Sequence, residues 1–72
     1  MSEVRGALSA WYCKSEDVPF IVAKLNNPPY IAVENVLPAG SNTCIVLFRG
    51  SYPFIENDLK DKYPSIISGG RY

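Results

Sequence analysis

The sequence predicts a small, mainly β domain that closes into a five-stranded barrel with one short helical turn. Short runs of β-branched and aromatic residues recur about every 8–12 residues, and clusters of Gly, Pro, Asn and Ser separate them. Asn57 is a good N-cap for a single helical turn that runs through Lys62. Many short strands at even spacing are typical of small barrels, which leave no sheet edge open.

The segment Thr43–Phe48 is the predicted centre of this domain. Its residues are mostly β-branched or aromatic, and both of its alternating sets of side chains are apolar, so neither face should be freely solvated. Gly50 allows a tight reversal after it. Tyr52–Glu56 then reads as a further extended segment, which Pro53 confines to a sheet edge or a bulge.

The segment Val18–Leu25 is ambiguous, since a helix capped by Ser15 would also fit it. Its apolar run is short, β-branched and interrupted by Pro19, which favours a strand. The other predicted strands are Val4–Cys13, Tyr30–Leu37 and Pro64–Ser68, and Gly69–Tyr72 is expected to be a flexible tail. The whole chain, residues 1–72, is predicted to be one domain, with the barrel over about residues 4–68.

An alternative interpretation takes Ser15–Asn27 and Ser51–Tyr63 as true helices. The order of elements then becomes βαββαβ, the order of a ferredoxin-like α+β domain. Such a domain would be a small structural or interaction protein, bacterial or from a phage, that acts by surface contact or as a dimer.

The composition is that of a folded globular domain, with 47% hydrophobic, 12% aromatic and 19% charged residues. Seven basic residues balance seven acidic ones, so no net charge draws the chain to nucleic acid or to anionic membranes. No membrane-spanning apolar run and no signal peptide is apparent, which predicts a nuclear or cytoplasmic protein. Cys13 and Cys44 fit that compartment as reduced core residues, with a disulfide between neighbouring strands as the alternative.

Enzyme chemistry has little support in the sequence. The chain contains no histidine, no Cys-x-x-Cys pair, no phosphate-binding Gly loop and no nucleophile elbow. Calcium-loop spacing is also absent. We therefore predict a protein that is not an enzyme, with no catalytic residue, cofactor or metal site.

Two segments resemble a Tudor domain: SAWYCKSEDVPFIVAKL, residues 9–25, and TCIVLFRGSYPFIENDLK, residues 43–60. The shared features are a strand, an acidic turn, a strand with Ala-Lys-Leu, a strand ending in an aromatic residue, a Gly turn and an Asn-Asp-Leu turn. The stretch from LPAG, residues 37–40, into VLFRG, residues 46–50, is also similar to PWWP domains. Both families belong to the SH3-like barrel group, and the likeness covers roughly residues 7–66.

The resemblance implies a protein-interaction module that binds a methylated lysine or arginine side chain, for example on a histone tail. Tudor-type domains hold the methylammonium in a cage of aromatic rings, because a diffuse cation is attracted to ring faces. By position, the rings of this chain would be Phe48, Tyr52, Phe20 and either Trp11 or Tyr12. The expected partner is a protein or peptide, and the expected state is a monomer.

A further alternative keeps the SH3-like barrel and lets it bind nucleic acid. That function needs a basic face. The residues that could build one are Lys14, Lys24, Arg49, Lys60, Lys62 and Arg71.

Overall fold

The computed structural model describes residues 6–72 and has an α+β fold, so the predicted barrel is wrong. The elements are β1 (Leu8–Lys14), the 3-10 turn η1 (Ser15–Asp17), α1 (Val18–Leu25), β2 (Ile31–Pro38), β3 (Thr43–Gly50), α2 (Pro53–Lys62) and β4 (Ile67–Arg71). The four strands form one sheet in the order β2-β3-β1-β4, and all neighbours are antiparallel. This βαββαβ arrangement is ferredoxin-like, in agreement with the alternative interpretation of the sequence.

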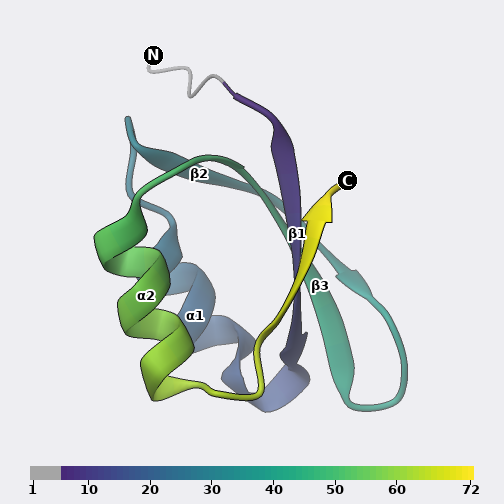
Figure 1. Cartoon of the computed structure of the whole chain (residues 1–72). Coiled ribbons are helices and arrows are strands. Elements are labelled where there is room, and N and C mark those ends of the chain that lie inside the picture. The colour runs from purple at the N-terminus through teal and green to yellow at the C-terminus, as the bar shows by residue number, and fades with distance from the viewer. Residues whose placement is uncertain (1–5) are drawn as a thin grey trace.

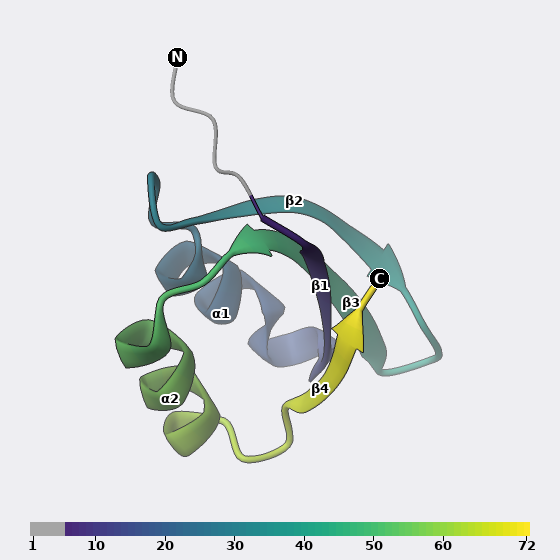
Figure 2. The same cartoon turned by 45° about the horizontal axis from the view of Figure 1, so that its top comes forward.

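The molecule has two layers. Both helices lie on one face of the sheet, while none of the helices or strands of residues 6–72 covers the other face (Figures 1 and 2). β1 and β3 are the central strands, and β2 and β4 form the two edges. The sheet curves but does not close, because its edge strands pair with no other strand of the described chain. We call the uncovered side of the sheet the open face.

The expectation that Val18–Leu25 is a strand is wrong, since these residues form α1. Pro19 lies in the first turn, where its missing N–H costs no hydrogen bond and its fixed φ suits a helix. Ile21 and Leu25 are one turn apart and both are fully buried. Burial of this stripe against the sheet outweighs the strand preference of β-branched residues.

Tyr52–Glu56 is likewise not an extended segment, because α2 already begins at Pro53 rather than near Asn57. The carboxylate of Glu56 accepts hydrogen bonds from the Tyr52 backbone N–H at 2.7 Å and from the Ser51 hydroxyl at 3.3 Å. The first backbone N–H groups of a helix have no acceptor within the helix, and Glu56 provides one for the N–H of Tyr52. Pro53 again occupies the first turn of a helix.

The C-terminal part also differs from the prediction. The closing strand is β4, so the expected strand over Pro64–Ser68 and the expected flexible tail over Gly69–Tyr72 are both misplaced. A Cβ at Gly69 would lie 2.8 Å from the Tyr12 ring, so the ring rests directly on the glycine backbone. The N-terminal strand begins at Leu8, and the first residues of the predicted Val4–Cys13 strand lie outside the described part of the chain.

Three strand predictions are confirmed: Thr43–Phe48 lies within β3, Tyr30–Leu37 overlaps β2, and Val4–Cys13 overlaps β1 from Leu8 onward. The core lies between the sheet and the helices. Its buried members are Trp11, Cys13, Ile21, Leu25, Ile31, Val46, Phe48 and Leu59. Val46 on β3 pairs with Trp11 on β1, so this set of side chains defines the helix-facing side of the two central strands.

Candidate interaction surface

Two of the five predicted cage residues belong to the core. Trp11 and Phe48 are each only 2% exposed, and their rings meet edge to face with centroids 5.0 Å apart. The Lys60 ammonium lies 5.3 Å from the Trp11 ring centroid, so this ring already has a cation of the same chain beside it. Both rings pack between sheet and helices and do not form a surface site.

The other three predicted residues lie on separate surfaces. Tyr12 belongs to the open face, since it alternates with buried Trp11 and Cys13 on β1. Phe20 is exposed on α1, on the opposite side of the sheet, and Tyr52 immediately precedes α2. The barrel rim on which these rings were expected to meet is absent, and the structure brings the five residues together at no single point. Their assignment to a ligand stays a prediction.

One predicted ring does belong to an exposed aromatic cluster. Tyr52 lies 4.6 Å from Tyr30 and 6.2 Å from Phe54, measured between ring centroids. Tyr30 is 54% exposed and Phe54 is 83% exposed. Neither was predicted from the sequence, although each directly follows a proline that marks the start of an element, where side chains tend to point outward.

A group of apolar side chains lies on the open face. Strand pairing places Ala10 opposite Leu47, and Tyr12 opposite Ile45 and Ile67, all on the side away from the helices. We call the apolar residues of this side the open-face patch. Its members are Leu8, Ala10, Tyr12, Ala32, Leu37, Ile45, Leu47 and Ile67.

Residues at the centre of the open-face patch are buried, whereas residues at its edge are exposed to solvent. Ala10 and Leu47 are only 4% and 5% exposed, yet they are not part of the core under the helices. Ile67 on the edge strand is 66% exposed. Strand pairing places a charged residue at each end of this face. Lys14 lies at one end of β1, and Arg49 lies opposite Leu8 at the other end, roughly 20 Å away at the rise of a strand. Between them, the paired residues of β1 and β3 on this face carry no charge, and β2 adds the polar side chain of Asn35 opposite Leu47.

Local chemistry explains why Arg49 does not point into the patch. Its Nη1 donates a hydrogen bond to the Gly6 carbonyl at 2.9 Å. The guanidinium therefore ties the chain before β1 to the end of β3. The basic residues proposed for nucleic acid are also dispersed, since Lys24, Lys60 and Lys62 lie on the helices, and Lys24 and Lys62 both pair with Asp58 at 3.6 Å.

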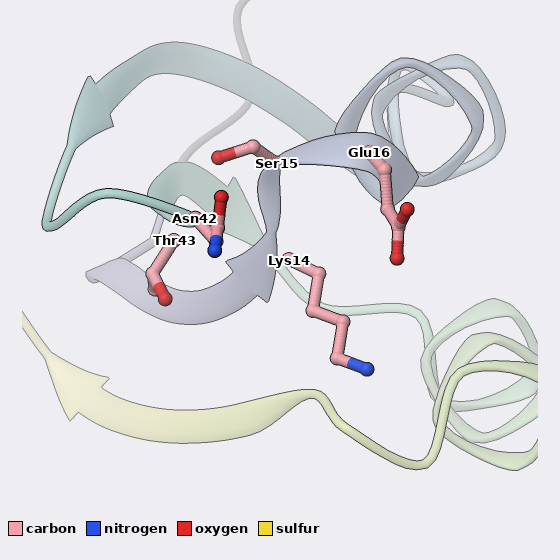
Figure 3. A pocket seen from close by; sticks show the side chains of 5 residues that line it. All are labelled: Lys14, Ser15, Glu16, Asn42 and Thr43. Carbon is pink, nitrogen blue, oxygen red and sulfur yellow. The ribbon is translucent and has the colours of Figure 1, made fainter.

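Two hollows lie elsewhere on the molecule. A polar hollow of about 410 Å³ lies beside the end of β1 and is lined by Lys14, Ser15, Glu16, Asn42 and Thr43, whose side chains point in different directions (Figure 3). A groove of about 500 Å³ runs between α1 and α2, lined by Phe20, Ala23, Lys24, Leu59, Lys62 and Tyr63. Neither brings together a nucleophile and a base. Within residues 6–72, no cluster of His, Cys, Asp or Glu side chains is arranged to hold a metal ion.

Comparison of the chain with protein-family models, with curated proteins and with solved structures finds no match. The fold places the chain in the α+β class and does not by itself indicate a function. None of the helices of the described chain has the length and apolar character needed to cross a membrane.

Proposed function

We propose that this protein is a non-enzymatic interaction module that forms a homodimer through its open-face patch. The observation that supports this proposal is the uncharged apolar side of the central strands, with dry Ala10 and Leu47 at its centre and half-exposed neighbours around them. An apolar surface of this extent on a small domain marks a site of protein contact. A second copy would remove it from water.

The size of the face suits a dimer. Four strands about 4.8 Å apart and about seven residues long span roughly 450 Å² in projection, and the relief of the side chains increases the accessible area. A standard interface takes about 800 Å² from each partner. An area of about 800 Å² is about a sixth of the 4669 Å² accessible surface of one chain. A dimer of standard size therefore requires the whole open face.

The choice of a second copy rests on charge and symmetry. The chain carries no net charge, so two copies do not repel one another at long range. Lys14 and Arg49 lie at the ends of the patch, where solvent screens them in a face-to-face pair. A twofold axis through the patch needs only one self-complementary surface, and stacking two open faces yields a closed core between two sheets.

Sedimentation equilibrium of the parent and two matched variants tests this proposal. Ile67→Lys places a charge on the open-face patch at an exposed edge position, and Phe54→Lys places the same charge on α2, at a side chain that is 83% exposed. We expect a dimer for the parent and for Phe54→Lys, and a monomer for Ile67→Lys. A monomeric parent, or equal dissociation of both variants, would contradict the proposal.

A second candidate function retains the recognition of a methylated lysine or arginine and assigns it to Tyr30, Tyr52 and Phe54. The observation that favours it is that three aromatic side chains gather at one place on the surface, with Tyr52 4.6 Å from Tyr30 and edge to face with Phe54. Exposed ring faces in such a cluster attract a diffuse cation.

Titration with a trimethyllysine histone peptide and with its neutral isostere, followed by NMR, tests this second candidate. We expect only the cationic peptide to shift Tyr30 and Tyr52 resonances. Tyr30→Ala should remove binding, and Phe20→Ala, which removes a ring from α1 instead, should leave it unchanged. Equal binding of the isostere, or no shift with either peptide, would rule it out.

A further inference from the structure

The two cysteines of the chain face each other across the central strands. Cys13 on β1 pairs directly with Cys44 on β3, and both are free thiols. Directly paired residues of antiparallel strands point to the same side of the sheet, here the side that the helices cover. The pair therefore lies away from the open-face patch, and an inference from it does not depend on the proposed dimer.

The backbone spacing at this pair suits a disulfide. The Ser15 N–H donates to the Asn42 carbonyl at 2.9 Å, and it continues the β1–β3 ladder two residues beyond Cys13. Hydrogen-bonded positions alternate along an antiparallel ladder, so Cys13 and Cys44 form a hydrogen-bonded pair with Cα atoms about 5.5 Å apart. This Cα spacing is within the disulfide range of about 4.4–6.8 Å, but the Cβ atoms of a hydrogen-bonded pair lie about 5.5 Å apart and must approach to about 4 Å for the bond to close.

The two thiols differ in access. Cys13 is 1% exposed, whereas Cys44 is half-buried. The Cys44 Sγ lies 3.3 Å from the Ser15 hydroxyl, and Ser15 also lines the polar hollow at the end of β1 (Figure 3). Thr43, the residue before Cys44, lines the same hollow. Cys44 itself does not line this hollow, and its partial exposure together with the contact to Ser15 makes it the more accessible of the two thiols.

The environment of Cys13 disfavours it as the thiol that attacks peroxide first. Burial raises the pKa of the Cys13 thiol from 9.0 to about 11, and Asp17 and Cys44 add to this effect. Because the thiolate is the nucleophile, a buried and protonated Cys13 does not react first. It remains as a thiol next to Cys44.

We propose that Cys44 and Cys13 form a peroxide-reactive pair, in which Cys44 is oxidised first and Cys13 closes the disulfide. The Cys44 thiolate attacks one oxygen of hydrogen peroxide, which gives a sulfenic acid and releases hydroxide. The Cys13 sulfur then displaces water from the sulfenic acid and loses its proton, so that two thiols and one peroxide yield one disulfide and two waters. The Cys44 side chain turns from Ser15 toward Cys13 for this second step.

Intact-mass spectrometry of the folded parent treated with hydrogen peroxide tests the proposal. We expect the loss of two hydrogens from the monomer, reversed by a phosphine reductant, and a peptide map that links Cys13 to Cys44. Peroxide treatment of Cys13→Ser should stop at a sulfenic acid on Cys44, which dimedone traps. Cys44→Ser changes only a half-buried position and should remain unoxidised, because its remaining thiol is buried.

Alkylation with iodoacetamide gives a readout that does not need a variant. We expect Cys44 of the folded parent to react at least about tenfold faster than Cys13, since accessible thiols react first. Three results would overturn the proposal: a parent that only gains oxygen atoms, a disulfide that joins two chains, or faster alkylation of Cys13 than of Cys44.

Discussion

Replacement of Phe48 by alanine separates the two folds that the sequence allows. In a barrel with Phe48 at its rim the ring would be exposed, and its loss would remove a ligand contact but leave the domain stable. In the present structure the ring is 2% exposed and packs edge to face against Trp11 at 5.0 Å. Phe48→Ala therefore opens a cavity in the core.

The expected loss is large for a chain of this size. Truncation of a buried Phe to Ala costs about 3–5 kcal/mol, which includes the lost contact with Trp11. A chain of 72 residues has a total stability of about 4–11 kcal/mol. We expect Phe48→Ala to lose about 4 kcal/mol in urea denaturation followed by circular dichroism, which is at least about a third of the total stability.

Phe54→Ala is the matched control, because it removes the same ring from a site that is 83% exposed. We expect this variant to lie within about 0.5 kcal/mol of the parent. If Phe48→Ala lost less than about 1 kcal/mol, the ring would not belong to the core and the assignment of the helix-facing side of β3 would be wrong.

Three further predictions concern other contacts. Glu56→Ala should lower stability by about 1 kcal/mol in urea titrations, since it leaves the Tyr52 N–H at the start of α2 without its partner. Gly69→Ala should displace the Tyr12 ring, whose Cε1 would lie 2.8 Å from the new Cβ, and lower the melting temperature by a few degrees. Because the pKa of Cys13 is raised from 9.0 to about 11 in the folded state, the unfolded state loses this proton first as pH rises. Its contribution should be complete below pH 9 and lost between pH 9 and about 11, so Cys13→Ala should have a flatter urea-midpoint profile over that window.

Strands with alternating apolar residues or with a continuous apolar run could be predicted from the sequence. Thr43–Phe48 was expected to be buried on both faces, and in the structure Val46 and Phe48 face the core while Leu47 lies in the open-face patch. Local composition is sufficient here because a central strand contacts apolar groups on both sides.

The helices could not be predicted from local preference. Val18–Leu25 contains β-branched residues and Pro19, and only its contact with the sheet makes the helix favourable, because Ile21 and Leu25 become fully buried. In the sequence Pro19 argues against a helix and Pro53 indicates a sheet edge or a bulge, although a proline equally starts a helix. The wrong assignments of Val18–Leu25 and Tyr52–Glu56 as strands together changed the predicted fold from two layers to a barrel.

The prediction of an aromatic ligand site depended on the same assignment of Val18–Leu25 as a strand. Trp11 and Tyr12 are adjacent, and the sequence required that one of them face outward, but it did not indicate which. The helices decide this, because they cover the side of β1 that carries Trp11. Phe48 is buried for the same reason, whereas the open-face patch becomes visible only when the pairing of the strands is known.

Amide correlation spectra recorded over a range of protein concentrations probe the proposed dimer residue by residue. We predict concentration-dependent shifts at Tyr12, Ile45 and Leu47 on the central strands, which Ile67→Lys abolishes. Amides of Phe20 on α1 and Phe54 on α2, on the other side of the sheet, should stay fixed. Spectra that do not change at any concentration, or shifts confined to the helices, would contradict association through the open face.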